Sequence, residues 1–353
     1  MDIISYTEKL NKNNSTLNKY FTNDVVLFDI ECLGLSSLKY PIYLIGCAKR
    51  NDDDAIITLF FAENIDEEEE LLLSFEEYIS DKNTLMSFNG ANFDEPFIVE
   101  RCKKLGISTS IREKTHIDLY RRILKAKSLL NLNNYKQKTI EEFMGLFRED
   151  KYDGGKLINV YKEYSKNKDQ NLKDLLILHN YEDVKGMLKV IEALAYIDFL
   201  DCDITDISSE CNNEKYDLLS RSNINLPILI NKINEQYTLL AKNNNISLSF
   251  PIIEDELSLY IKDYNSYVHL ISEDIVIPKE LASSLDKSSY DKATKENCRI
   301  KTTAQFIKIN KNIELSESIH KFKFNYADKS VYIKIDELDT ITQKNIIKFY
   351  IKH

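Results

Sequence analysis

Three apolar, β-branched runs near the N-terminus constrain the fold of this chain more than any other feature. They are DVVLFDIE, YPIYLIGCAK and AIITLFF, all within residues 24–61, and the short turn-forming segments LGLSSLK and RNDDD separate them. Runs of this length with such short connections predict three strands joined as an antiparallel meander. The fold must therefore contain a sheet that begins with three neighbouring strands.

Helices and short strands alternate after the meander. Acidic residues 66–70 lead into the amphipathic LLLSFEEYI, as a helix N-terminus favours. TLMSF predicts a fourth strand, DEPFIVERCKKLGI a second helix that Asp94 can cap, and HIDLY a fifth strand. The clearest of the later helices is expected over residues 172–200. Strands and helices in this order predict an α/β or α+β domain over residues 1–200.

A change of pattern divides the chain after residue 200. Residues 201–217 are polar and patternless, which predicts a linker. Short alternating runs such as ISLSF, YVHLI and SVYIKI follow, and they predict a smaller β-rich C-terminal domain over residues 218–353 with a final helix. A length of 353 residues suits two domains.

Composition and charge exclude several classes of protein. A net charge of -10 predicts a soluble chain without a general attraction to nucleic acid or anionic lipid, so any polyanion needs a local site. The six cysteines form no C-x-x-C pair, which disfavours a disulfide framework or a zinc knuckle. The opening MDIISYTEKLNKNNST lacks the apolar run of a signal peptide, and no stretch approaches a membrane span. We therefore expect a cytoplasmic protein without a membrane partner.

Acidic residues stand in three otherwise apolar segments: FDIECLGL (28–35), FNGANFDEPFI (88–98) and HNYEDV (179–184). Asp29 and Glu31 are two residues apart on a strand and therefore point to the same face. Two carboxylates aimed at one place repel each other, which raises at least one pKa unless a cation lies between them. This pair predicts a cation site.

Two further carboxylates, Asp94 and Asp183, extend the predicted site. Oxygen ligands in this number suit Mg²⁺ or Mn²⁺ better than zinc, and four carboxylates balance two divalent ions. Two such ions about 4 Å apart can activate water and stabilise the leaving oxygen of a phosphodiester. His179, one helical turn before Asp183, is suited to orient and deprotonate that water, whereas Tyr181 should point away.

The three segments resemble, in order and type, the Exo I, Exo II and Exo III motifs of the DEDD exonuclease superfamily, which has the ribonuclease H-like fold. FNGANFDEPFI looks especially like the proofreading domains of family B DNA polymerases. Together with HIDLY and HNYEDV, residues 24–200 are most similar to the YprB-like, ribonuclease H-like group of Firmicutes. The resemblance implies a mixed five-stranded sheet flanked by helices, with its first three strands antiparallel, and hydrolysis from the 3′ end.

Individual site residues follow from the same resemblance. Matched by position, the metal-binding acids would be Asp29, Glu31, Asp94 and Asp183. Gly34 and Leu35 match the backbone and the apolar side chain that hold the terminal nucleotide, and Asn89 matches the substrate-side Asn of the second motif. The third motif usually carries a His five residues before its last Asp or a Tyr four residues before it. Here His179 stands in the Tyr position.

Each feature taken alone also has a simpler interpretation. D-x-E fits an edge strand with a salt bridge, and NGANFD fits a turn with a helix cap. His179 could be a structural histidine, Leu35 could be ordinary core, and Asp118 fits a helix N-cap before LYRRIL. Residues 287–329 hold ten Lys and Arg against five Asp and Glu, interleaved with Phe and Tyr. That segment could track a phosphate backbone, but it also fits the solvated face of an amphipathic strand.

The sequence therefore predicts a metal-dependent 3′→5′ exonuclease that acts on a single-stranded end of DNA or RNA through two Mg²⁺ or Mn²⁺ ions. One alternative is a non-catalytic nucleic-acid-binding protein with a ribonuclease H-like scaffold. The four acids disfavour it, because negative charge that faces phosphates weakens binding. Another alternative is a nucleotide phosphatase or endonuclease that uses the same carboxylates.

Overall fold

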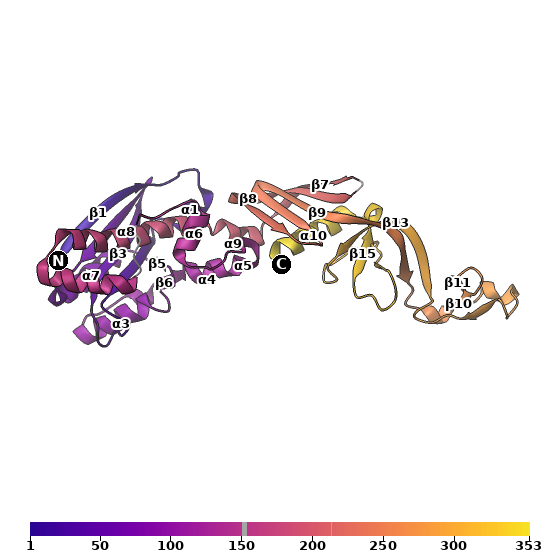
Figure 1. Cartoon of the computed structure of the whole chain (residues 1–353), viewed down its shortest axis with the longest axis horizontal. Coiled ribbons are helices and arrows are strands. Elements are labelled where there is room, and N and C mark those ends of the chain that lie inside the picture. The colour runs from indigo at the N-terminus through magenta and orange to yellow at the C-terminus, as the bar shows by residue number, and fades with distance from the viewer. Residues whose placement is uncertain (150–153, 213) are drawn as a thin grey trace. The chain divides into compact units, whose positions relative to one another are not determined.

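The computed structural model describes residues 1–149, 154–212 and 214–353. These residues form two compact units, which are described separately: unit 1 spans Met1–Asp198 and unit 2 spans Phe199–His353. Figure 1 shows that unit 1 combines a sheet with several helices, whereas unit 2 consists mainly of strands. Each unit has its own sheet, so the polar stretch near residue 200 marks a true change of architecture.

A mixed six-stranded sheet forms the centre of unit 1, in the order β1-β4-β3-β2-β5-β6. Its first four strands pair antiparallel, whereas β2, β5 and β6 run parallel. The strands are β1 (Asp2–Lys9), β2 (Val25–Cys32), β3 (Ile42–Asn51), β4 (Asp54–Phe61), β5 (Thr84–Ser87) and β6 (Thr115–Asp118). The predicted meander and α/β class are confirmed. The sheet has one strand more than expected because β1, a mostly exposed edge strand, carries only a weak apolar pattern.

Helices cover both faces of this sheet. Val26, Phe28 and Ile30 pack on one face in a core with residues of α2 and α3, and α8 lies against β2, β3 and β4. Because side chains alternate along a strand, Asp29 and Glu31 point away from that core. The helices are α1 (Ser15–Tyr20), α2 (Glu68–Ile79), α3 (Asp94–Leu105), α4 (Leu119–Ile123), α5 (Lys127–Leu130), α6 (Gln137–Phe143), α7 (Gly154–Asn167), α8 (Gln170–Glu192) and α9 (Ala195–Leu200).

Helix boundaries differ from the sequence prediction in two places. The single helix expected over 172–200 is divided into α8 and α9. Asp94 is the first residue of α3, while Phe93 occupies the N-cap position, so the carboxylate of Asp94 is not used as a cap. Asp118 does cap α4 as predicted, because its side chain accepts a hydrogen bond from the backbone N–H of Arg121.

Gly46 allows α8 to lie close to the sheet. It stands in β3 directly opposite Asp29 of β2. A Cβ atom at this position would lie 2.1 Å from Asn180 Oδ1 and 2.7 Å from Val184 Cγ2, both on α8. A glycine inside a strand often marks such a close approach. The missing side chain therefore sets the distance between α8 and the strand that carries Asp29 and Glu31.

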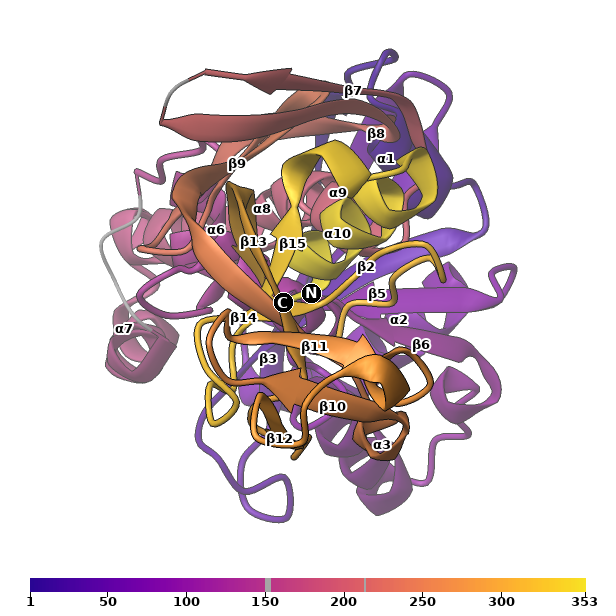
Figure 2. The same ribbon diagram turned by 90° about the vertical axis from the view of Figure 1, so that its right-hand side faces the viewer.

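Unit 2 contains a second six-stranded sheet, β13-β15-β14-β9-β8-β7, and a three-stranded sheet, β11-β10-β12. Helix α10 contacts β7 and β9, as Figure 2 also shows. The elements are β7 (Ile204–Cys211), β8 (Lys215–Ile233), β9 (Thr238–Tyr260), β10 (Tyr267–Leu270), β11 (Ile275–Pro278), β12 (Tyr290–Lys292), β13 (Arg299–Ile309), β14 (Phe322–Lys323), β15 (Val331–Lys334) and α10 (Thr340–Lys352). A β-rich second unit with a final helix is thus confirmed.

Residues 201–217 differ from the expected linker. They include β7, which pairs with β8 and belongs to the sheet of unit 2. Most of β7 is exposed at the sheet edge, which explains why its sequence is polar and reads as a linker.

The basic segment 287–329 supplies part of the core of unit 2. Phe306 and Phe322 are buried and pack with Leu257 and Tyr332. Phe324 and Tyr326 remain about half exposed. The alternating pattern of this segment is thus largely that of half-buried strands. Among the aromatic side chains of β14 and the loop after it, Phe322 is buried, and Phe324 and Tyr326 face solvent.

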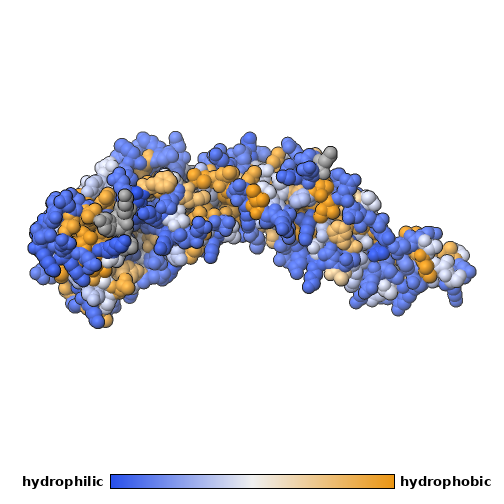
Figure 3. Space-filling view, in the orientation of Figure 1, coloured by the Kyte–Doolittle hydropathy of each residue, from blue (hydrophilic) through white to orange (hydrophobic). Residues whose placement is uncertain are grey.

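The surface of the described residues is mainly polar. Figure 3 shows hydrophilic residues over most of the visible face of both units, with apolar residues scattered among them. In the three described ranges, no helix combines the length and the apolar character that a bilayer crossing needs.

The close approach at Gly46 leads to a stability prediction. Gly46→Ala should lower the free energy of unfolding by about 1–3 kcal/mol, because the added methyl must displace Asn180 and Val184 of α8. Urea unfolding followed by circular dichroism measures the change. An unchanged midpoint and slope would show that α8 does not depend on this contact.

Candidate metal centre

The edge of β2 beyond Leu27 brings Asp94 to the two acids of that strand. Pairing between β2 and the parallel β5 ends at Leu27 and Met86, and the chain after β5 then enters α3. The backbone N–H of Ile30 hydrogen-bonds to the Asp94 carboxylate at this edge. Asp94 therefore reaches the strand segment between Asp29 and Glu31.

Helix α8 adds His179 and Asp183 to the same place. His179 Nε2 lies 3.3 Å from Glu31 Oε1 and 3.1 Å from Asp183 Oδ2. One ligand atom from each of these three residues lies within 4.8 Å of the other two, close enough to share one ion. The two residues of α8 are four positions apart, so they share the helix face that was predicted. Tyr181 points away from them, since its hydroxyl donates to Glu8 of β1.

Burial and mutual repulsion both disfavour the ionised forms of Asp29 and Asp94. The pKa of Asp29 is raised well above its usual range, chiefly by burial and then by the negative charges of Asp183, Asp94 and Glu31. Burial, followed by the charge of Glu31, raises the pKa of Asp94 to about 7. The four acids thus act on one another as a single cluster.

This donor set fits a hard divalent cation. It offers carboxylate oxygens from three elements of the fold: the end of β2, the start of α3 and the middle of α8. A cation placed among these oxygens would favour their ionised forms and offset the repulsion that raises the pKa of Asp29 and Asp94. The residues present therefore fit a hard divalent cation.

Buried polar residues support the loop that precedes Asp94. Asp118 accepts hydrogen bonds from the backbone N–H groups of Asn89 and Ala91, at 3.2 and 3.4 Å. Asn89 has a φ of +63°, in the left-handed region that asparagine tolerates. A Cβ at Gly90 would lie 2.3 Å from Ser87 Oγ and 2.6 Å from Asp94 Oδ2. The loop therefore needs a glycine beside the Asp94 carboxylate.

A second chain of contacts fixes the start of α3. Ser87 Oγ lies 2.8 Å from His116 Nε2, and His116 Nδ1 lies 2.6 Å from Glu95 Oε2. This set resembles a nucleophile–base–acid triad in outline, but Ser87 is fully buried and no substrate could reach its hydroxyl. The contacts instead join β5, β6 and α3 next to Asp94.

The predicted substrate-side residues lie in two loops. Gly34 is buried, and a Cβ there would lie 2.5 Å from the ring of Tyr40. Leu35, in the loop that follows β2, is 87% exposed, so the interpretation of Leu35 as ordinary core is wrong. The side chain of Asn89 accepts a hydrogen bond from Asn92 at 3.0 Å.

Sequence reasoning missed two residues that contact the acids, Asn180 and Arg148, and a third, Glu141, that binds Arg148. Asn180 Nδ2 donates to Asp29 Oδ2 at 2.8 Å, while its own Oδ1 is buried without a hydrogen-bond partner. Arg148 Nη1 donates to Asp183 Oδ1 at 2.6 Å, and Arg148 also binds Glu141. The glycine inside the YLIGCAK run could have indicated the close approach of Asn180. No local pattern marks Arg148 or Glu141.

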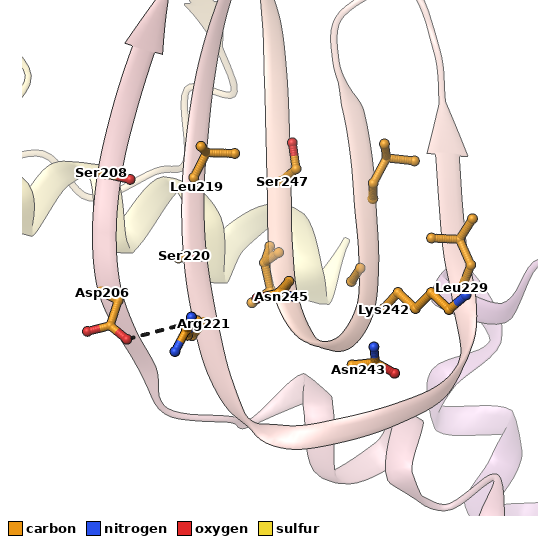
Figure 4. Close-up of a pocket in the computed structure, with 13 residues that line it drawn as sticks. Asp206, Ser208, Leu219, Ser220, Arg221, Leu229, Lys242, Asn243, Asn245 and Ser247 are labelled. Carbon is orange, nitrogen blue, oxygen red and sulfur yellow. Dashed lines mark ion pairs between the residues drawn. The ribbon is translucent and has the colours of Figure 1, made fainter.

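Unit 2 holds a separate open hollow of about 720 Å³ on the face of β7, β8 and β9 (Figure 4). Among the described residues that line it, Asp206 is the single carboxylate, and it lies 4.0 Å from Arg221. The rest are mainly Leu, Ser and Asn side chains with Lys242. The described lining thus lacks a cluster of acids like the one in unit 1.

The raised pKa of Asp94 gives a pH prediction for the metal-free protein. Because the folded state binds this proton more tightly than the unfolded state, stability should be highest near pH 4. It should then fall, by up to about 1.4 kcal/mol per pH unit, until pH reaches about 7. Asp94→Asn keeps an acceptor for the Ile30 N–H and should make this decline shallower, although Asp29 keeps a raised pKa of its own. The variant should therefore be more stable than the parent at pH 8 in EDTA.

Urea unfolding at pH 4, 6 and 8 measures this effect. Glu163→Gln, which alters an exposed acid of α7, is the matched control and should follow the parent. Parallel pH profiles for the parent and Asp94→Asn would contradict the assigned repulsion.

A family model described as RNase_H superfamily matches residues 26–195, a segment that includes all five residues of the candidate metal centre. Over 50 residues, 14% of this chain, the sequence is 44% identical to a DNA polymerase of Ostreid herpesvirus 1 (isolate France) and covers 3% of that protein.

A solved structure of the family B DNA polymerase from the hyperthermophilic archaeon Pyrobaculum calidifontis aligns with a TM-score of 0.41 and 15% identity. The alignment covers 69% of this chain and 34% of that chain. The present chain thus spans a small part of either polymerase. The family match lies wholly within unit 1 and coincides with its mixed sheet and flanking helices. The sheet and flanking helices of unit 1 are therefore similar to the ribonuclease H-like fold.

Proposed function

We propose that this protein is a metal-dependent nuclease of the DEDD type, related to the YprB-like group, that removes nucleotides from the 3′ end of single-stranded DNA or RNA. One observation supports it above all: four acids and His179 from separate segments gather at the end of β2. The match to the RNase_H superfamily model supports nuclease chemistry for the same segment.

The acids have the first role in this proposal. Asp29, Glu31, Asp94 and Asp183 would hold two Mg²⁺ or Mn²⁺ ions. When bound, such ions supply an activated water and charge stabilisation for the leaving oxygen of a phosphodiester. His179, between Glu31 and Asp183, would orient the water and accept its proton at Nε2.

The loops beside the acids would hold the substrate. Leu35 is exposed after β2 and would pack against the terminal base, while Gly34 and Asn89 would contact the sugar and phosphate of the same nucleotide. Residues 1–200 would make up the exonuclease domain of a cytoplasmic enzyme, and residues 218–353 contain none of its site residues. The presence of four acids argues against a purely nucleic-acid-binding scaffold, because such a site gains affinity by losing negative charge.

Digestion of 5′-end-labelled single-stranded DNA and RNA tests the activity. With Mg²⁺ or Mn²⁺ we expect labelled products that shorten progressively, no cleavage in EDTA, and no activity in Asp29→Asn or Asp183→Asn. Glu163→Gln should retain full activity. Cleavage of a circular single strand would instead indicate an endonuclease. Binding without cleavage under every metal condition would indicate the non-catalytic scaffold.

The base assignment has its own test. His179→Ala should lower turnover by about 10² to 10⁴, because a positioned base contributes that much. Tyr181→Phe is the matched control, since Tyr181 lies on the same helix but faces β1, and it should leave turnover unchanged. Single-turnover rates at saturating Mn²⁺ separate this loss from weaker metal binding. An unchanged rate in His179→Ala would show that His179 is not the base and has a structural role.

A further inference from the structure

Arg148 forms a clamp that joins Asp183 to a second, fully buried acid. Its Nε and Nη2 donate to the two carboxylate oxygens of Glu141, at 2.5 and 2.6 Å, and its Nη1 donates to Asp183 Oδ1 at 2.6 Å. The Arg148 side chain is 7% exposed and that of Glu141 is 0% exposed. Each guanidinium nitrogen thus has a carboxylate partner inside the protein.

The surrounding helices are shaped for this clamp. Gln137 Nε2 donates to Glu141 Oε1 at 2.8 Å and to the backbone carbonyl of Asp183 at 2.7 Å, which ties α6 to α8. A Cβ at Gly186 would lie only 1.8 Å from Glu141 Oε1, so α8 needs a glycine where it passes Glu141. The Gln137 hydrogen bonds and the close approach at Gly186 hold Glu141, and with it Arg148, against the part of α8 that carries Asp183.

The geometry assigns one orientation to the Asp183 carboxylate. Its Oδ1 accepts from Arg148, which leaves Oδ2 facing His179 at 3.1 Å and, beyond it, Glu31. The planar fork of arginine fixes direction as well as charge, which a lysine ammonium cannot do. A role for Arg148 in gripping substrate phosphate fits less well, because its nitrogens are already bound and its side chain is buried.

We propose that Arg148, held by Glu141, is a positioning residue that orients Asp183 for metal binding. The inference rests on the proposed function, since it takes Asp183 as a metal ligand. Partners behind a ligating group typically change metal affinity by 10- to 100-fold when they are altered. Arg148→Lys keeps the positive charge and loses the fork, so it separates orientation from electrostatics.

Mn²⁺ titration of the full-length protein, followed by the electron paramagnetic resonance of free Mn²⁺, tests the clamp without measuring activity. Arg148→Lys should weaken Mn²⁺ binding by about tenfold or more. Glu141→Gln, which breaks the same fork from the other side, should weaken it in the same direction. It serves as the second variant if Arg148→Lys does not fold.

Arg101→Lys is the matched control. Arg101 also binds a buried acid, Glu68, through two nitrogens, yet it contacts none of the proposed metal ligands. It should lose stability while Mn²⁺ affinity stays at the parent value. Parent affinity in both Arg148→Lys and Glu141→Gln would overturn the clamp and leave the proposed function standing. A parent protein that binds no Mn²⁺ would overturn both.

Discussion

Four carboxylates repel one another at the end of one buried strand, and the contacts around this part of unit 1 offset that repulsion only in part. Asp29 and Asp94 both have a raised pKa, because burial removes water and the neighbouring acids add negative charge. The partial remedies are visible around them: Asn180 donates to Asp29, the Ile30 N–H to Asp94, and Arg148 to Asp183. A group of acids that remains under such strain is typical of a functional site rather than of a stabilising one.

Close backbone approaches keep these acids together. Gly46 lets α8 lie on β3, Gly90 leaves room for Asp94 beside Ser87, and Gly186 lets α8 pass Glu141. Each is a position where any side chain would meet a neighbour within 2.5 Å. The centre is therefore assembled by helix and loop placement around β2, and its geometry depends on packing as much as on the ligands themselves.

The sequence predicted the scaffold of unit 1 well, because apolar runs with short turns specify strands and their order. It also singled out four acids that the structure brings together, since D-x-E on a buried strand is costly without a partner, and their role as metal ligands stays a prediction. It failed for β1 and β7, whose exposed edge positions carry little apolar pattern. It could not find Arg148 or Glu141, because their relation to Asp183 arises only when α6 packs on α8. The roles of Leu35 and Asn89 stay predictions.

The proposed function requires that the acids at the end of β2 hold divalent ions. Anomalous diffraction from crystals of the full-length protein grown with Mn²⁺ tests it most directly. We expect strong anomalous peaks within about 2.0–2.5 Å of carboxylate oxygens of Asp29, Glu31, Asp94 and Asp183, distances that are typical of oxygen ligation of such ions. A well-ordered site at saturating Mn²⁺ with no anomalous peak among these four carboxylates would contradict it.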